Sequence, residues 1–353
     1  MSSFCREPLA RLRPLPPLLY TLLLALSLGA ANEPVTKWST RPQPLPGART
    51  IWDDLPEVSP WRYAKWSGVY KGEIRPAQDI LRQIELGLKA GGKILSIEPG
   101  LYGTEPGDSV KYKTGLRIDG LTNLELVMEG VVILSRSRRE TMVVFENFVN
   151  VKIRGLTLDI HKDVFHFTQG TVREVDAAAG KTVVELHAGY PEPLLIAGKV
   201  RKGAVHLPGS LLLKPKVFSL SEVALEALGN RNYRVDTGVS TSNIFPGEYM
   251  TFTFHDGAHA LQLNGMSNVL LEDVTLHGSR MFCLVDVNGY NTVIRRLRLT
   301  PGPMPDGASI PRLKASSQDG IHFKSKRGDQ SVVEDCLIEC HDDEEIARAR
   351  AVP

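Results

Sequence analysis

Apolar and polar residues alternate in short segments that recur along much of the chain. Each segment opens with a polar turn residue, continues with alternating apolar positions, and ends after a break in a second apolar pair. Such segments begin at Asn123, Asn150, Asn268, Asn291 and Gln330. Asn268 and Asn291 lie 23 residues apart, and units this short cannot bury themselves alone, so we expect them to stack into one core.

The alternation within each segment has the period of a β-strand rather than that of a helix. We therefore predict an all-β protein built as a parallel β-helix, a β-solenoid whose coils lie one on another. Leucine-rich repeats are the competing architecture at this repeat length, but their spaced Leu and Asn pattern is missing from the sequence.

The repeat is absent between Phe167 and about Phe254. Residues 171–193, TVREVDAAAGKTVVELHAGYPEP, predict two strands around a Gly-containing turn, hence a hairpin. We expect residues 167–254 to form a small inserted β-barrel or β-sheet module. Coils over residues 119–166 precede it, and coils over residues 255–353, incomplete at the end, follow it.

Residues 32–118 are predicted to form an N-terminal cap region with a short helix and the first strands. In RPAQDILRQIELGLKAGG, residues 75–92, apolar Ile80, Ile84 and Leu88 recur every four residues. Pro76 suits the first helical turn, and Gly91 suits the end. The next residues, KILSIEPGLYG, predict a strand followed by a turn.

The first 31 residues have the pattern of a cleaved signal peptide. Arg6, Arg11 and Arg13 precede the apolar run PLLYTLLLALSLGAA, which ends in small residues near Ala31. A membrane-spanning helix normally needs about 20 apolar residues. We therefore expect an exported protein, periplasmic or secreted, without a stable membrane anchor.

Composition narrows the possible partners and cofactors. Hydrophobic residues make up 42% and charged residues 23% of the chain, as in an ordinary folded protein. Without residues 1–31, 39 of 42 basic and 39 of 40 acidic residues remain, so nucleic acid is not an expected partner. Cys283, Cys336 and Cys340 are too few and too uneven for a disulfide framework. We expect Cys336 and Cys340 to be core positions rather than a metal pair.

Two acidic clusters lie one repeat apart in SSQDGIHFKSKRGDQSVVEDCLIECHDDEE, residues 316–345. Asp342 and Asp343 follow Asp319 by 23 and 24 residues. Because stacked strands lie about 4.8 Å apart, we predict that these carboxylates face one another across adjacent coils. Glycoside hydrolysis needs such a pair, one carboxylic acid and one carboxylate. The alternative is that all three are ordinary turn residues.

DGIHF (319–323) and VVEDCLIECHDD (332–343), with FTQGTVREVD and GYP in the inserted segment, resemble glycoside hydrolase family 110. The likeness spans roughly Ile74 to Asp343. It implies a right-handed parallel β-helix with inserted β-barrel modules. It also implies an exo-acting α-galactosidase, often specific for α-1,3 linkages, that inverts configuration without a cofactor.

Matched by position, the resemblance makes Asp319, Asp342 and Asp343 the acidic active-site residues. His322 and His341 would bind or orient the substrate, a glycan with terminal α-galactose. A homodimer is among the oligomeric states that the sequence leaves open.

Arg280 is a further candidate from spacing. It lies 11 residues before Asn291, and Asp319 lies 11 residues before Gln330. We therefore predict that Arg280 stacks beneath Asp319 and favours its role as base; a solvated loop arginine is the alternative. His322, three residues after Asp319, would point to the opposite face of an ideal strand unless a turn at Gly320 redirects it.

Two rival functions remain at this stage. One is a pectin-type hydrolase, as in glycoside hydrolase family 28, which has the same fold. The motif of that family has Asn-Thr-Asp at the position where this chain has Ser-Gln-Asp. A non-catalytic carbohydrate-binding β-helix is the other. The final residues, EEIARARAVP, are charged and predicted weakly helical instead of completing a coil. The resembling family continues beyond them, so we expect a truncated or frameshifted product whose activity is in doubt.

Overall fold

β-Strands dominate the computed structural model of the protein. It describes residues 64–106, 113–193, 200–207, 211, 213–214, 224–236, 243–254, 258–324, 330–340 and 345–348. These residues belong to one compact unit, 58–353. The predicted signal peptide, residues 1–31, lies outside the described residues.

Most elements are strands of two to seven residues. Before the inserted segment the chain forms α2 (Trp66–Val69), β1 (Ile74–Pro76), α3 (Gln78–Lys89), β2 (Ile94–Ser96), β3 (Gly100–Gly103), β4 (Lys113–Asp119), β5 (Thr122–Val127), β6 (Val131–Ser135), β7 (Glu140–Glu146), β8 (Val149–Arg154), β9 (Thr157–Ile160) and the 3-10 helix η2 (Lys162–Val164). The inserted segment forms β10 (Phe167–Asp176), β11 (Lys181–Leu186), β12 (Val200–His206), β13 (Ala224–Gly229), β14 (Asn232–Asp236) and β15 (Tyr249–Phe254). The last part forms β16 (Leu261–Asn264), β17 (Ser267–Glu272), β18 (Thr275–Leu276), β19 (Leu284–Val287), β20 (Tyr290–Arg295), β21 (Arg298–Leu299), β22 (Ile321–Lys324), β23 (Val332–Glu334), β24 (Leu337–Ile338) and β25 (Ile346–Arg348).

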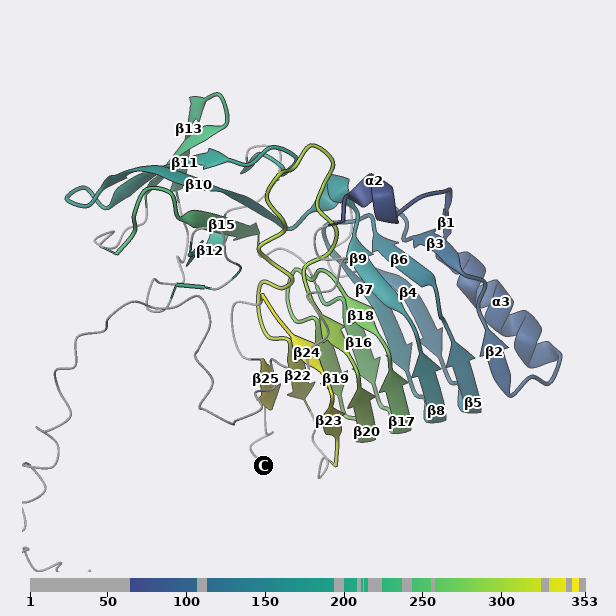
Figure 1. The fold of residues 1–353 in the computed structure, drawn as a ribbon. Helices are drawn as coiled ribbons and strands as arrows, with labels where there is room; N and C mark the ends of the chain where they lie inside the picture. Colours follow the sequence, from purple (N-terminus) through teal and green to yellow (C-terminus); the bar gives the residue numbers. More distant parts are fainter. Residues whose placement is uncertain are drawn as a thin grey trace, which may run out of the picture. The chain divides into compact units, whose positions relative to one another are not determined.

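Three parallel sheets hold the strands outside the inserted segment (Figure 1). Sheet 1 has the order β25-β22-β19-β16-β7-β4, sheet 2 the order β2-β5-β8-β17-β20-β23, and sheet 3 the order β1-β3-β6-β9-β18-β21-β24. The chain visits them in rotation, so that β4, β5 and β6 enter different sheets, and so do β7, β8 and β9. Each strand pairs with its counterpart one repeat away. The structure is therefore mostly β with parallel sheets, as the sequence repeats predict.

The asparagines that open the repeats form a ladder beside sheet 2. The Nδ2 of Asn150 donates to the Oδ1 of Asn123 at 2.9 Å, Asn268 donates to Asn150 at 3.0 Å, and Asn291 donates to Asn268 at 2.8 Å. All four have φ of 54° or 55°, a left-handed conformation that asparagine tolerates better than most residues. Both properties explain why asparagine marks the start of the repeat.

Inward-facing side chains of the three sheets form a continuous apolar core. In β8, Val151 and Ile153 are buried, whereas Lys152 and Arg154 between and after them face outward. Cys336, predicted as a core position, is half-buried and packs against this core. The alternation read from the sequence is thus the alternation between inside and outside of a sheet.

The predicted helix over residues 75–92 is confirmed as α3. Ile80 and Ile84 are buried in the main core, but Leu88, which shares their spacing, stays exposed. Pro76 ends β1 and precedes the N-cap instead of standing in the first turn. Gly91 follows the C-cap with φ 72°, the left-handed conformation that commonly ends a helix.

The inserted segment forms a separate antiparallel sheet with the order β12-β15-β10-β11-β14-β13. The hairpin predicted over residues 171–193 is confirmed by the pairing of β10 with β11. This inserted sheet has its own core, which includes Val184, Val235 and Phe252. The insertion leaves the parallel pairing intact, because Val143 of β7 pairs directly with Leu261 of β16.

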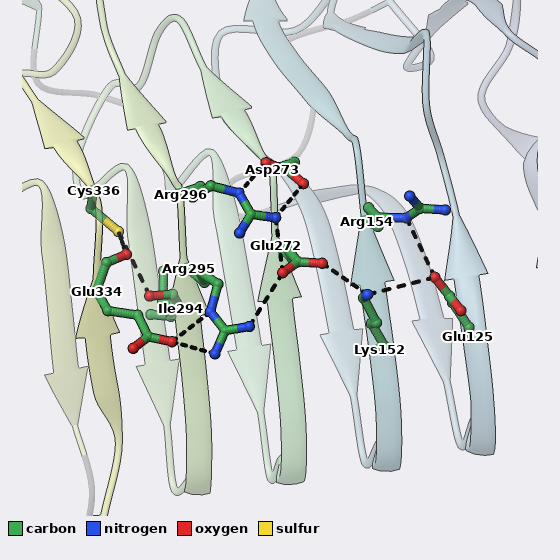
Figure 2. A network of polar contacts seen from close by, with 10 residues as sticks. All are labelled: Glu125, Lys152, Arg154, Glu272, Asp273, Ile294, Arg295, Arg296, Glu334 and Cys336. Carbon is green, nitrogen blue, oxygen red and sulfur yellow. Dashed lines mark hydrogen bonds and ion pairs between the residues drawn. The ribbon is translucent and has the colours of Figure 1, made fainter. Parts of the chain in front are cut away.

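Charged side chains alternate in sign across the outer face of sheet 2 (Figure 2). We call this set the ionic ladder, and its members from coil to coil are Glu125; Lys152 and Arg154; Glu272 and Asp273; Arg295 and Arg296; and Glu334. Lys152 Nζ lies 2.8 Å from Glu272 Oε2, and Arg296 Nε lies 2.7 Å from Asp273 Oδ1. Opposite charges therefore meet at each step of the stack.

β25 corrects the expectation that the last residues are weakly helical. Ile346 pairs in parallel with Ile321 of β22, and the N–H of Ile321 donates to the carbonyl of Glu345 at 3.0 Å. The free backbone groups of β22 outweigh a weak local helical preference, because a strand can satisfy them and a helix cannot. The step from Ile321 to Ile346 is 25 residues, two more than the interval used to align the acidic clusters.

None of the helices in the described ranges has both the length and the apolar character that spanning a membrane requires.

Candidate active site

Asp319 and His322 meet at the entrance to β22. The side chain of Asp319 is buried, and its Oδ2 lies 2.5 Å from Nδ1 of His322. Ile321 and Phe323 point into the core, so His322 between them faces outward. Asp319 precedes the strand, and the chain bends at Gly320, which brings both side chains to the same face. The Nδ1–H of the imidazole donates to the carboxylate.

Gly320 makes this bend possible because the backbone there has no room for a side chain. A Cβ atom would lie 2.7 Å from the carbonyl oxygen of Glu345 and 2.8 Å from Cγ2 of Ile338. Both distances are shorter than van der Waals contact, so only glycine lets the neighbouring backbones approach this closely.

Two aromatic side chains extend the site across the neighbouring coils. The ring of Phe282 stacks on the ring of His322, with centroids 4.3 Å apart and planes at 17°. Its other face stacks on the ring of His259, at 5.1 Å and 4°. We call His259, Phe282 and His322 the ring column. It follows the stacking direction of sheet 1.

Sequence reasoning missed His259 and Phe282, although a signal was present. His259 stands two residues before the first residue of β16, and Phe282 stands two residues before the first residue of β19. Asp319 stands two residues before β22 in the same way. Aligning the repeats on the first strand instead of on the asparagine would have placed these three in one column.

Several buried polar atoms around Asp319 have no hydrogen-bond partner within the described residues. They are Ser317 Oγ, Gln318 Oε1, His322 Nε2 and His259 Nδ1. Burial, with smaller effects from the charges of Lys324 and His322, lowers the pKa of His259 to about 4, so its ring is neutral at pH 7. Because buried polar groups are nearly always hydrogen-bonded, this cluster suits a ligand rich in hydroxyl groups.

Arg280 does not stack beneath Asp319. Ser279 pairs with Ser316 and Leu284 with Ile321, in each case 37 residues later, so Arg280 is level with Ser317. The position beneath Asp319 belongs to Phe282.

The difference arises in a turn. Val293 pairs with Val332, 39 residues later, so two additional residues lie between β22 and β23, and the offset from Gln330 is not comparable with the offset from Asn291. The guanidinium of Arg280 is buried and donates to the carbonyls of Ser137 and Val164, the latter at 2.7 Å. It is neither a solvated loop residue nor a neighbour of the carboxylate in sheet register.

The remaining predicted residues, His341, Asp342 and Asp343, lie outside the described residues. Their predicted approach to Asp319 stays a prediction.

No model of a known protein family matches the chain, and no curated protein matches it. The function must therefore be argued from the site.

In the part of the chain that the structure describes, no three His, Cys, Asp or Glu side chains are grouped so that they could hold a metal ion. Cys283 and Cys336 are free thiols. Burial raises the pKa of Cys283 to about 12, which makes its thiolate scarce and the residue a poor nucleophile. What the site offers instead is a carboxylate and an imidazole, the groups of acid–base chemistry, with the ammonium group of Lys324 lying 5.0 Å from the centroid of the Phe282 ring.

Proposed function

We propose that the three parallel sheets wind as a right-handed parallel β-helix and that the protein is an exported glycoside hydrolase. Its substrate would be a glycan with terminal α-linked galactose, α-1,3-linked by preference. The family resemblance of the DGIHF and HDD motifs supports this, as does the rotation of the chain through three sheets. The chain after residue 31 has equal numbers of basic and acidic residues, which favours a neutral sugar over a uronic acid as the substrate.

The observation that carries the proposal is the contact between Asp319 and His322. A carboxylate that is 3% exposed is held at 2.5 Å by an imidazole. The residues before it, Ser317 and Gln318, carry buried polar atoms that have no partner among the described residues. Structural carboxylates in a β-turn are normally solvated or bonded to backbone N–H groups. This one is held in a defined orientation by a side chain that is itself only 14% exposed.

In an inverting mechanism Asp319 would activate water, and the HDD segment would supply the acid that protonates the leaving oxygen. The N–H of His322 occupies Oδ2 and fixes the plane of the carboxylate, which leaves Oδ1 for the water. Nε2 of the same ring, which has no partner among the described residues, would form a hydrogen bond with a sugar hydroxyl. Inversion requires the two carboxyl groups to lie roughly 6.5–9.5 Å apart.

The ring column favours a second candidate, a carbohydrate-binding protein without catalysis. Three rings stacked face to face across successive strands of sheet 1 offer an extended edge with ring nitrogens at both ends. Such a surface would bind a sugar chain whether or not the acidic residues act.

The test is to express the full chain and to measure galactose release from α-1,3-linked galactosides, with polygalacturonate as the competing substrate. Asp319→Asn, Asp342→Asn and Asp343→Asn should each lower kcat by roughly 10²–10⁴, the usual contribution of a general acid or base. Asp163→Asn, at an exposed aspartate of η2, is the control and should leave kcat unchanged.

Galactose release that survives Asp319→Asn would remove Asp319 from the mechanism. If the folded protein releases no sugar but binds galactosides, and Phe282→Ala abolishes that binding, the non-catalytic function is the correct one.

A further inference from the structure

The loop that carries Asp319 is unusually long for this fold. Residues 300–320 connect β21 to β22, whereas the same connection one coil earlier, from Leu276 to Leu284, takes seven residues. A long connection has many conformations to lose and needs anchors to hold one of them. The 300–320 loop has such anchors, and several of them come from the inserted sheet.

Gln169 of β10 holds the backbone of this loop at two points. Its Nε2 donates to the carbonyl of Pro311 at 2.9 Å, and its Oε1 accepts from the N–H of Leu313 at 3.0 Å. Gln169 is fully buried. A side-chain amide thus pairs with the loop as the backbone of a neighbouring strand would. Tyr190 adds a third bond, from its hydroxyl to the carbonyl of Ile310 at 2.8 Å.

His187 fixes which end of the Gln169 amide faces which partner. Its Nδ1 lies 3.2 Å from Nε2 of Gln169, and its Nε2 lies 2.9 Å from Oγ1 of Thr171. Nε2 of Gln169 is a donor, so Nδ1 of His187 must accept and Nε2 of His187 must carry the proton. Burial lowers the pKa of His187 to about 4, which keeps the ring in this neutral form.

On its other side the loop is anchored to sheet 3. Nη1 of Arg312, the residue between the two points held by Gln169, lies 2.8 Å from Oδ1 of Asp159, and both side chains are at most 1% exposed. From Leu313 onward every residue up to Ser317 is buried, and Oγ of Ser316 donates to the carbonyl of Met281 at 2.6 Å. A continuous packed path therefore runs from Gln169 to Asp319.

We infer that the inserted sheet serves as a positioning element for Asp319 and His322, with Gln169 as the positioning residue that sets the 300–320 loop. The importance of Asp319 rests on the proposed function. The positioning itself is a matter of geometry, and its test needs no substrate.

The test compares Gln169→Leu with a matched pair of tyrosine variants in the full chain. Tyr190→Phe removes one hydrogen bond to the loop, whereas Tyr233→Phe removes one bond of 2.6 Å to Glu192 in the inserted segment. Amide exchange of residues 310–319 should rise roughly 100-fold in Gln169→Leu, which removes two hydrogen bonds to the loop at about tenfold each. It should rise less in Tyr190→Phe and stay unchanged in Tyr233→Phe.

The second readout is the NMR signal of the His322 ring proton that is shared with Asp319. It should shift in Gln169→Leu and stay in place in Tyr233→Phe. If galactosides prove to be the substrate, kcat should fall in Gln169→Leu with KM nearly constant.

Unchanged exchange and an unchanged ring-proton signal in folded Gln169→Leu would overturn the inference. So would equal effects in Tyr190→Phe and Tyr233→Phe, a comparison that stands if Gln169→Leu fails to fold. If only the activity is missing, the proposed function fails and the positioning inference remains.

Discussion

Charged side chains gather in two regions of the molecule, on the outer face of sheet 2 and at the turns that lead from sheet 3 into sheet 1. On sheet 2 most charges of the ionic ladder lie at the surface: the side chains of Arg295 and Arg296 are 37% and 45% exposed, and Glu272 is the buried member. At the turns, Arg280, Arg312 and Asp319 are buried, and so is Asp159 of β9, which pairs with Arg312. The same residue types therefore stand in very different surroundings.

The difference teaches which charges to associate with function. An exposed ion pair gains little, because water screens it and ordering two long side chains opposes it. A buried charge loses its hydration, which a partner offsets only with good geometry. The second kind, concentrated where Asp319 is held, is the arrangement expected of a site whose geometry matters more than its stability.

The largest difference between the two regions should appear when one arginine is removed from each. Arg312→Met leaves Asp159 buried, with the hydroxyl of Tyr70 and the N–H of Ile160 as its remaining donors among the described residues. We expect a loss of about 3–5 kcal/mol in the free energy of unfolding, the usual effect of stranding a buried charge. Arg296→Met on the ionic ladder is the matched control and should cost less than about 1 kcal/mol.

Urea unfolding of both variants measures this difference. Adding Asp159→Asn to Arg312→Met should recover part of the loss, because the stranded charge is gone. Equal losses for Arg312→Met and Arg296→Met would mean that burial does not distinguish the two regions.

The two regions should lose their contributions to the free energy of unfolding at different pH values as the solution is acidified. Burial lowers the pKa of His259, which stacks beside the turns into sheet 1, to about 4, below the ordinary histidine value of about 6.5. The unfolded chain therefore takes up this proton first, and stability that is complete above pH 6.5 falls as the pH drops toward 4.

On the ladder, hydrogen bonds from Lys152 and Arg296 lower the pKa of Glu272 and Asp273, respectively. Their contribution is present above the ordinary carboxyl values and is lost only as the pH falls below about 4.5. Denaturant unfolding at pH 7, 5.5 and 4.5 should show most of the decline before the ladder titrates, and His259→Asn should make it shallower. A flat profile from pH 6.5 to 4.5 would contradict the histidine contribution.

The smallest expected effect is the coupling free energy of one ion pair within the ionic ladder. A double-mutant cycle of Arg296→Met and Asp273→Asn is expected to give a coupling of less than about 1 kcal/mol. It should vanish in 1 M salt, where the screening length is about 3 Å. The same cycle on Arg312 and Asp159 should keep most of its coupling in salt, because salt does not reach a buried pair.

The sequence was informative wherever structure repeats and uninformative where a contact occurs once. The asparagine spacing predicted the parallel stack, and the alternating segments predicted the β10–β11 hairpin. The ladder also had a signal, which the sequence-based predictions did not use. The fourth residues after Asn150, Asn268, Asn291 and Gln330 are Arg154, Glu272, Arg295 and Glu334, and their charges alternate.

The position of Arg280 was not predictable, because two additional residues in one turn shift the register and a count from the anchors cannot show in which turn they lie. Gln169 is a single polar residue in a strand, with no period to mark it. Its role depends on a loop about 140 residues away, and only the fold brings the two together. The contact of Asp319 with His322 likewise depended on the bend at Gly320, which the spacing allowed but did not require.

The pairing of β10 with β15 has a consequence for how the chain folds. The asparagines on either side of the insertion are 118 residues apart, against 23 for the next pair. Closing the longer loop costs about 1.4 kcal/mol more in chain entropy, which would slow the joining of the two halves of the stack. Phe167 at the start of the insertion pairs with Thr253 at its end. Once the inserted sheet has folded, the chain enters and leaves it at neighbouring strands. The strands before and after the insertion are then already close together when they pair.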